Sequence, residues 1–370
     1  MNQINGFPRE LLEASVLERV TYFQNYTMPH RKLQMVADQL MQAIKQPAGA
    51  SLIFILGPSG VGKSTLLQKI SSMLIEEALA EMEVDKGYIP VAGVEAIAPD
   101  TGNFDWKDFY IRSLQILGEP LIDKKVSRAD TKLKLRFALE SALKHRRLDA
   151  FFIDEAQNFG KVVSGRKMLD QTDCIKSLAN VVQTQFVLCG TYELLDLRNL
   201  SAQLCRRSLD VHFSRYKLNE QDLKAFRSVL STFQSYLPVQ ETPDLISHSE
   251  QCYERSVGCV GILKDWLTKT LNGVLEQQPD STTITIHDLE RYAWPLQQCS
   301  IMAKEIYDQE KRLEDSAETL NELRKYLGFD SELASEDSPP LSKTSKRQKG
   351  KKIGQPSPTR RPVGSEHASS

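Results

Sequence analysis

The stretch SLIFILGPSGVGKSTLLQKI, residues 51–70, joins three patterns that decide the fold. An apolar run over residues 51–56 predicts a buried strand, a glycine-rich turn follows it, and apolar residues at helical spacing come next. The turn fits the phosphate-binding pattern G-x-x-x-x-G-K-[ST], so its backbone N–H groups would surround the β- and γ-phosphates of a nucleotide. The residues expected to contact the nucleotide are Gly57, Pro58, Ser59, Gly60, Val61, Gly62, Lys63, Ser64 and Thr65.

Two side chains of this turn have chemistry suited to ATP and Mg²⁺. Lys63 would neutralise charge on the terminal phosphate, and the hydroxyl of Ser64 would hold Mg²⁺. Such a site also needs a second acidic group for the metal and a base that orients water. The run LDAFFIDEAQNF, residues 148–159, ends a predicted buried strand with Asp154 and Glu155. We expect Asp154 to hold Mg²⁺ through water and Glu155 to polarise the attacking water. The alternative is an acidic pair that caps the next helix.

Two further positions complete the predicted catalytic set. Thr191 ends the predicted strand in TQFVLCGTYEL, residues 184–194, where its hydroxyl would contact the γ-phosphate or the attacking water. The alternative for Thr191 is a helix N-cap. Arg206 and Arg207 end a predicted helix just before the last strand, where one of them would reach the γ-phosphate of a neighbouring subunit. Alternatively, the two cations only complement the helix dipole.

The order of patterns along the chain predicts an α/β fold with a parallel sheet, because five apolar runs alternate with helical segments. From residue 219 onward strand patterns nearly vanish, and capped helical patterns predict a small helical lid. The last forty residues are rich in Ser, Pro, Lys and Arg, which predicts a disordered basic tail. The expected boundaries are 1–48 for an N-terminal helical segment, 49–218 for an ATPase domain, 219–330 for the lid and C-terminal helices, and 331–370 for the tail.

Composition indicates an ordinary globular protein, with 41% hydrophobic residues, 26% charged residues and a net charge of −1. The six cysteines form no C-x-x-C pair, which favours reduced thiols over a metal site. No apolar run reaches the ~20 residues that span a bilayer, and the N-terminal residues do not read as a signal peptide. We therefore expect a cytoplasmic protein with no membrane partner.

The phosphate-binding turn, the acidic pair, the polar strand end and the arginines, followed by a helical lid, resemble the AAA+ class of P-loop NTPases over about residues 50–300. In detail the chain resembles the TnsC/TniB family of transposition regulators. The stretches that carry this resemblance are GPSGVGKST (57–65), FFIDEAQNF (151–159), VLCGTYELL (187–195), QLCRRS (203–208) and SVGCVGILKDWL (256–267). The family's Gly-x-x-Gly lid is matched by Gly258 and Gly261. One departure is that no arginine closely follows Gly261, and Lys264 is the nearest cation.

The resemblance implies an ATPase that assembles with ATP and Mg²⁺ on double-stranded DNA as a homo-oligomeric ring or helical filament. Such an assembly would link a target-selector protein to a transposase, and hydrolysis would disassemble it. One alternative is a helicase loader or replication initiator built on the same ATPase core. Another is a DNA-bound adaptor with little turnover. A P-loop kinase fits less well, because Asp154, Glu155 and the arginines suit attack by water better.

Two segments are candidates for DNA contact, since tracking phosphates requires clustered Lys and Arg. The first follows the second predicted strand, where the resemblance implies a helix that faces a central channel and carries Lys107 and Arg112. The second, residues 122–147, has cations near its start and a predicted buried stripe of Leu135, Ala138, Leu139, Ala142 and Leu143. Its candidate DNA contacts are Lys124, Lys125, Arg128, Lys132 and Lys134. The alternative is a solvated helix face. The tail holds eight Lys or Arg against one Glu over residues 341–370, which suits DNA, a partner, or solubility alone.

Overall fold

The computed structural model describes residues 6–99, 104–119, 132–161 and 165–329 of the chain. Contacts divide the chain into two units, Met1–Leu313 and Glu314–Ser370. The strands are β1 (Leu52–Leu56), β2 (Val91–Glu95), β3 (Ala150–Asp154), β4 (Gln185–Gly190) and β5 (Ser208–His212). The helices before β4 are η1 (Arg9–Glu13), α1 (Val16–Asn25), α2 (Arg31–Lys45), α3 (Lys63–Val84), α4 (Trp106–Ile116), α6 (Lys132–Arg146), η2 (Ala156–Gly160) and α7 (Gly165–Val182). The helices after β4 are α8 (Leu194–Arg198), α9 (Ala202–Arg207), α10 (Glu220–Tyr236), α11 (Ser249–Ser256), α12 (Val260–Gln277), α13 (Ile286–Tyr292), α14 (Leu296–Lys311) and α15 (Ala317–Tyr326).

The five strands form one parallel sheet in the order β2-β3-β4-β1-β5. The predicted parallel α/β architecture is therefore confirmed, and the strand before Thr191 lies beside the strand of the acidic pair. In the register, Leu56 lies opposite Gly190, and Ile153 lies opposite Leu188. The carboxyl ends of β1, β3 and β4 consequently meet at one edge, which is where parallel α/β sheets place their ligand sites.

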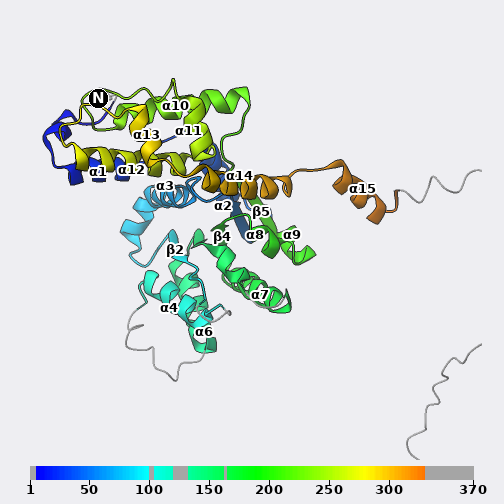
Figure 1. Ribbon diagram of the computed structural model, residues 1–370. Coiled ribbons are helices and arrows are strands. Elements are labelled where there is room, and N and C mark those ends of the chain that lie inside the picture. Colours follow the sequence, from blue (N-terminus) through cyan, green and yellow to red (C-terminus); the bar gives the residue numbers. More distant parts are fainter. Residues whose placement is uncertain (1–5, 100–103, 120–131, 162–164, 330–370) are drawn as a thin grey trace, which may run out of the picture. The chain divides into compact units, whose positions relative to one another are not determined.

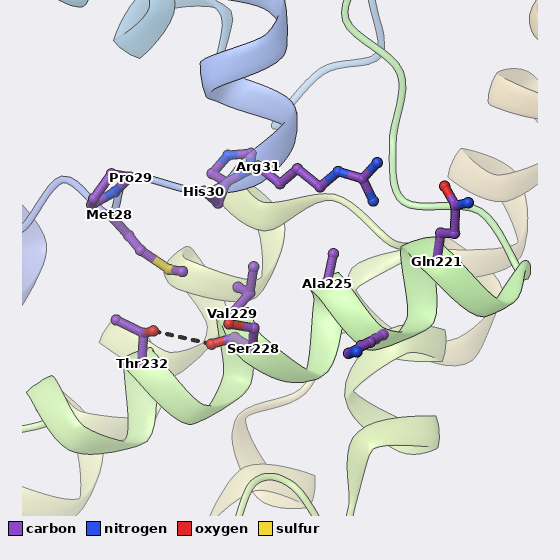
Figure 2. A pocket seen from close by; sticks show the side chains of 10 residues that line it. Met28, Pro29, His30, Arg31, Gln221, Ala225, Ser228, Val229 and Thr232 are labelled. Atoms are coloured by element: carbon purple, nitrogen blue, oxygen red, sulfur yellow. Dashed lines mark hydrogen bonds between the residues drawn. The ribbon is translucent and has the colours of Figure 1, made fainter.

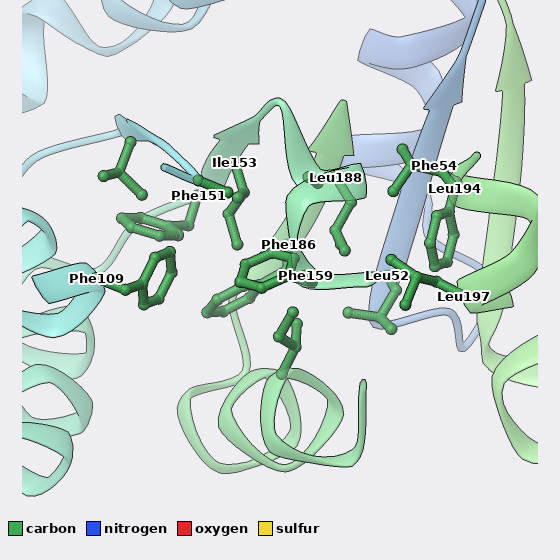
Figure 3. Packing of buried hydrophobic residues seen from close by; sticks show 14 of the residues in the cluster. Leu52, Phe54, Phe109, Phe151, Ile153, Phe159, Phe186, Leu188, Leu194 and Leu197 are labelled. Carbon is green, nitrogen blue, oxygen red and sulfur yellow. The ribbon is translucent and has the colours of Figure 1, made fainter. Parts of the chain in front are cut away.

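The two faces of the sheet are covered by different helices, because alternate residues of each strand point to opposite sides. Figure 3 shows one face, where Leu52, Phe54 and Phe151 from the strands pack among Phe109 of α4 and Leu194 of α8. On the other face, α2 and α3 cover Ile53, Ile55 and Phe152. Each large apolar side chain buried in this way contributes about 1.5–3 kcal/mol relative to an exposed one.

A separate apolar cluster holds the helical part together. It joins α1 to α10, α11, α12 and α13, with Phe23, Phe233 and Trp266 fully buried in it. In Figure 1 these helices gather at one end of the first unit, with α4, α6 and α7 at the other. The two N-terminal helices thus serve different cores, since α2 packs on the sheet through Leu33 and Leu40. Residues 26–30 connect α1 to α2 and thus join the helical part to the sheet; we call them the bridging segment.

Helix starts in the helical part follow the predicted caps. The Asn219 side chain accepts from the backbone N–H of Asp222 at the start of α10. At α13, Thr285 and Asp288 form a reciprocal capping box. In the second unit the structure describes α15, whose first turn is capped by the Ser316 hydroxyl. Among the described helices, none combines the length and the apolar character needed to cross a membrane.

Candidate functional site

The glycine-rich turn between β1 and α3 has the backbone shape that its sequence predicts. Gly60 and Gly62 adopt φ values of 74° and 110°, a region that residues with a Cβ rarely adopt. Gly62 is also the residue from which α3 starts. The first N–H groups of α3 have no partner within the helix, so they point with the turn toward the carboxyl edge of the sheet. This arrangement suits a phosphate chain.

Lys63 is buried behind this turn, with 8% of its side chain exposed. Its Nζ donates to the carbonyl oxygens of Gly57 and Pro58, at 3.1 and 2.9 Å. Burial lowers the pKa of Lys63, while the nearby Asp154 and Glu155 carboxylates act in the opposite direction. A buried ammonium that donates to two backbone carbonyls, with carboxylates nearby, is well placed to bind the negative charge of a phosphate.

Ser64 and Asp154 come together across the edge of the sheet. The Ser64 hydroxyl donates to Asp154 Oδ2 at 3.0 Å, and Asp154 Oδ1 accepts from the backbone N–H of Glu155 at 2.9 Å. A hydroxyl and a carboxylate in contact at the start of the helix after a phosphate-binding turn form an oxygen donor set of the type that Mg²⁺ prefers. The two side chains predicted as metal ligands therefore fit that ion.

Glu155 follows β3 with left-handed backbone angles, φ 51° and ψ 33°. This turn starts η2 without any capping bond from the Glu155 side chain, so the carboxylate does not act as the helix cap considered as an alternative. Its Oε2 accepts instead from Gln157 Nε2. Gln157 is buried and was not singled out by its sequence pattern, although an amide two residues after an acidic pair was visible there.

Thr191 lies just beyond the end of β4, next to the Asp154 strand. Its Oγ1 is buried and has no hydrogen-bond partner within the described part of the chain. Helix α8 begins at Leu194 with Glu193 at the N-cap position, so the Thr191 hydroxyl does not cap this helix. A cavity of about 260 Å³ separates Thr191 and the turn residues Pro58 to Gly60 from Met302, Glu305 and Ile306 of α14.

The two arginines lie at the opposite edge of the sheet from the phosphate-binding turn. The backbone N–H of Ser51, just before β1, donates to the Arg207 carbonyl oxygen at 3.0 Å. Strand β1 then separates Ser51 from Gly57, a distance of roughly 20 Å at about 3.3 Å per residue. The Arg207 guanidinium donates to Asn180 of α7 at 3.1 Å, and both arginine side chains are exposed. Neither is placed to reach the turn of its own chain.

The helical part closes on the turn through a contact between two glycines. The N–H of Gly261, at the start of α12, donates to the Gly60 carbonyl oxygen at 2.7 Å. A Cβ on Gly261 would lie 2.4 Å from that oxygen, so only glycine permits this approach. Lys264, one turn further along α12, donates from Nζ to the Gln24 carbonyl oxygen of α1 at 2.7 Å. The Lys264 ammonium therefore joins α12 to α1.

A small cavity of about 50 Å³ opens between the turn, α12 and the bridging segment. Val61, Gly62 and Thr65 line it from one side and residues 26–28 from the other. His30 also lines it, and its Nδ1 lies 3.1 Å from the Tyr216 hydroxyl. Burial, followed by the charges of Lys32 and Lys69, lowers the pKa of His30 to about 4, so the ring is neutral at pH 7.

The outer side of the bridging segment faces α10 across a wider groove of about 560 Å³ (Figure 2). Met28 and Val229 both line this groove, and the Arg31 side chain extends toward Gln221. Because Met28 and His30 line both hollows, a ligand in the inner cavity would press on a segment that also touches α10.

The candidate DNA residues are only partly within the described chain. Lys124, Lys125 and Arg128 lie outside the described residues. Lys132 and Lys134 are exposed at the start of α6, and Lys107 and Arg112 lie on α4, which packs against α6.

Two observations on α4 and α6 change the predicted DNA contacts and the predicted buried stripe. Arg112 pairs with Asp108 at 2.6 Å, so its charge is partly neutralised. The predicted buried stripe of α6 is wrong at Ala138, which is exposed. It is correct at Leu135, Leu139, Ala142 and Leu143. Ala138 lies at the margin of the stripe, where a helical residue faces solvent.

A family described as "AAA domain" matches residues 15–197. The chain is similar to this family over these residues, which make up just under half of its length. The match begins at α1 and ends in α8, so it spans the phosphate-binding turn, the acidic pair and Thr191. The parallel sheet with its flanking helices is the AAA+ P-loop NTPase fold, and the AAA domain supports an ATPase in general terms. No curated protein matches the chain.

Several solved structures resemble the chain at low identity. The Aeropyrum pernix ORC2 protein in its ADPNP-ADP complexes is 16% identical, with a TM-score of 0.49 over 74% of this chain and 70% of that one. The Walker-type ATPase PABY2304 of Pyrococcus abyssi is 15% identical, with a TM-score of 0.44 over 82% and 80%. Domain III of the Thermotoga maritima replication initiation protein DnaA is 16% identical, with a TM-score of 0.40 over 77% and 95%.

Proposed function

We propose that this protein hydrolyses ATP with Mg²⁺ at the carboxyl edge of its sheet. The observation that carries the proposal is the contact between Ser64 and Asp154, with Lys63 and Glu155 on either side. Lys63 neutralises phosphate charge, while Ser64 and Asp154 hold the metal ion, which stabilises charge on the phosphates when it is bound. Glu155 orients and polarises water for attack, and the unpartnered Thr191 hydroxyl donates to the γ-phosphate or that water.

The nucleobase has a matching place in this proposal. The cavity beside Val61 and Thr65 continues from the phosphate-binding turn toward α12 and the bridging segment. Met28, Leu33 and Val260 give it apolar walls, which suit the faces of an adenine ring. The bridging segment and α12 both border this cavity, so a base bound there would contact both. Nucleotide occupancy would thereby be felt by the helical part.

We also propose assembly into a homo-oligomer, which the placement of the arginines supports. Arg206 and Arg207 are exposed and lie away from the phosphate-binding turn of their own chain. In a head-to-tail ring or helical filament, one of them would reach the γ-phosphate held by the next subunit. Hydrolysis at each site would then depend on its neighbour.

We further propose that the oligomer forms on double-stranded DNA and links a target-selector protein to a transposase, with ATP hydrolysis releasing the assembly. The TnsC/TniB-like stretches support this role, and the exposed lysines of α6 support phosphate contact. Cytoplasmic localisation belongs to the same proposal. A replication-initiator or helicase-loader type of ATPase is the second candidate, because it shares the ATPase core and differs in the partner recruited.

The experiment that tests the DNA role measures affinity for duplex DNA as a function of salt, with ATPγS and with ADP. Two full-length variants are compared, and in both the eight tail cations of residues 341–370 are neutralised. One of them also carries neutral side chains at residues 124, 125, 128, 132 and 134. The salt slope of log K should fall by about 0.9 for each DNA phosphate that the neutral side chains no longer bind, on any sequence. Equal slopes would move the DNA site elsewhere, with Lys107 and Arg112 as the next candidates. Absence of binding with either nucleotide would remove the transposition role.

A further inference from the structure

We propose that Gln157 is a positioning residue that holds Glu155 and couples this carboxylate to the turn carrying Thr191. The inference rests on the proposed ATPase function and deepens it. Gln157 lies in η2, two residues after Glu155, and only 7% of its side chain is exposed. Its Nε2 donates to Glu155 Oε2, and its Oε1 accepts from the backbone N–H of Thr191 at 3.3 Å.

The orientation of the Gln157 amide follows from these two neighbours. An ionised carboxylate only accepts hydrogen bonds, whereas a backbone N–H only donates one. The NH₂ group must therefore face Glu155 and the oxygen must face Thr191, since the flipped amide would set acceptor against acceptor and donor against donor. A side chain with one donor end and one acceptor end is what this position requires, and neither a carboxylate nor an ammonium supplies both.

Gly190 makes room for this bridge. A Cβ built on Gly190, the last residue of β4, would lie 2.1 Å from Gln157 Oε1. The backbone of Gly190 is not in the left-handed region, so its conformation alone does not demand glycine. The demand is spatial, because the amide oxygen occupies the place that any other side chain would enter.

The left-handed turn at Glu155 brings the amide back toward β4. With φ at 51°, the chain leaves β3 abruptly, and the Asn158 N–H closes the turn on the Glu155 carbonyl oxygen at 2.9 Å. Asn158 itself is anchored separately, since its Nδ2 donates to the Ala96 carbonyl oxygen at 2.7 Å. The neighbouring buried amides of Gln157 and Asn158 thus make different contacts. Gln157 touches the carboxylate and the Thr191 turn, and Asn158 ties η2 to the chain just after β2.

This chain of contacts links the residue that meets the phosphate to the residue that orients water. The Thr191 hydroxyl is buried without a partner in the part of the chain described here, so a bound γ-phosphate oxygen can engage it. A shift of the Thr191 turn then moves its N–H, and the Gln157 amide transmits that movement to Glu155. Gln157 touches neither nucleotide nor water and acts only through Glu155.

The test uses the full-length protein with Gln157→Ala, and with Asn158→Ala as the matched control for loss of a buried amide in the same turn. Gln157→Ala should lower kcat about tenfold to a hundredfold, the range expected when a charged group loses a buried hydrogen bond. Its KM and its affinity for ATPγS should stay within about twofold of wild type. Affinity for ADP with aluminium fluoride, which imitates the phosphoryl group under attack by water, should fall by the same factor as kcat. In Asn158→Ala, the ratio of the affinity for ATPγS to the affinity for ADP with aluminium fluoride should stay as in wild type.

A second variant reaches the same contact without altering Gln157. Gly190→Ala pushes the amide oxygen away and should reproduce the loss of kcat, and adding Gln157→Ala should cost little more. The inference is overturned if Gln157→Ala retains wild-type kcat and aluminium fluoride affinity, if ATPγS affinity falls as much as kcat, or if the effects of the two substitutions multiply. A wild-type protein that binds nucleotide but never turns it over would instead overturn the proposed function, and the inference with it.

Discussion

The Ser64 hydroxyl donates to Asp154 Oδ2 at 3.0 Å, which ties the first turn of α3 to the end of β3 across the intervening strand β4. Ninety positions separate the two residues in the chain. The parallel sheet brings them together, because the ends of β1, β3 and β4 meet at one edge. Removing either partner should therefore affect metal-dependent chemistry without disturbing the core.

Ser64→Ala removes the hydroxyl from this pair. The Mg²⁺ concentration that gives half-maximal nucleotide binding should rise by about tenfold or more, since the ion loses a ligand and Asp154 loses its partner. Ser72→Ala is the control, because the Ser72 hydroxyl bonds the Gln68 carbonyl oxygen on an exposed part of α3. Magnesium titrations of both variants make the comparison. Identical Mg²⁺ dependence would remove Ser64 from the metal site.

Gly261→Ala should weaken nucleotide binding by separating α12 from the phosphate-binding turn. The new Cβ would lie 2.4 Å from the Gly60 carbonyl oxygen, so the 2.7 Å hydrogen bond between the two glycines must lengthen or break. Overpacking of this kind costs about 1–3 kcal/mol, which corresponds to a loss of about fivefold to 150-fold in affinity. Asn272→Ala, further along α12, serves as the control in a titration with fluorescent ATP. Unchanged affinity in Gly261→Ala would show that α12 does not close on the nucleotide.

The neutral His30 predicts a specific loss of stability in mild acid. Burial lowers its pKa to about 4 in the folded chain, against 6.5 for an ordinary histidine, so the unfolded chain binds more protons between these two values. The stabilising contribution is thus complete above pH 6.5 and is lost as the pH falls toward 4. The His30 ring also caps α2, because it accepts from the backbone N–H of Leu33. At pH 5 the free energy of unfolding should fall by about 1–2 kcal/mol more in wild type than in His30→Asn, which keeps a capping acceptor. Chemical denaturation at pH 7.5 and pH 5 gives the difference, and an equal fall in both proteins would refute it.

The separation of the arginines from their own phosphate-binding turn predicts complementation between inactive subunits. Arg206→Ala with Arg207→Ala should abolish hydrolysis while leaving the nucleotide site intact, and Lys63→Ala should abolish nucleotide binding. A mixture of the two proteins should recover activity, because some interfaces then pair an intact site with an intact arginine. Activity is measured across mixing ratios. A mixture that never exceeds the sum of its parts would show that the arginines do not act in trans.

The sequence predicted the site better where the chemistry is local than where it depends on packing. The phosphate-binding turn and the five strands were visible because their spacing is fixed by backbone geometry. The sequence did not show that α1 packs in the helical part whereas α2 packs on the sheet. The apolar spacing of a helix predicts a buried face but not the core against which that face packs. The role of Gln157 was hidden for a similar reason. Its partner Thr191 N–H follows another strand, and the space that it fills is left by Gly190, which also reads as an ordinary strand end.

The most direct test follows Glu155→Gln on duplex DNA after ATP is added and then chased with excess ADP. The substitution keeps Ser64 and Asp154 for the metal and Lys63 for phosphate, but it removes the base that orients water. Nucleotide affinity should stay near that of wild type, hydrolysis should fall by about a hundredfold or more, and the oligomers should persist on DNA long after wild-type oligomers have dissociated. Wild-type hydrolysis by Glu155→Gln, or equal lifetimes of the two assemblies, would contradict the claim that hydrolysis at this site ends an ATP-built assembly.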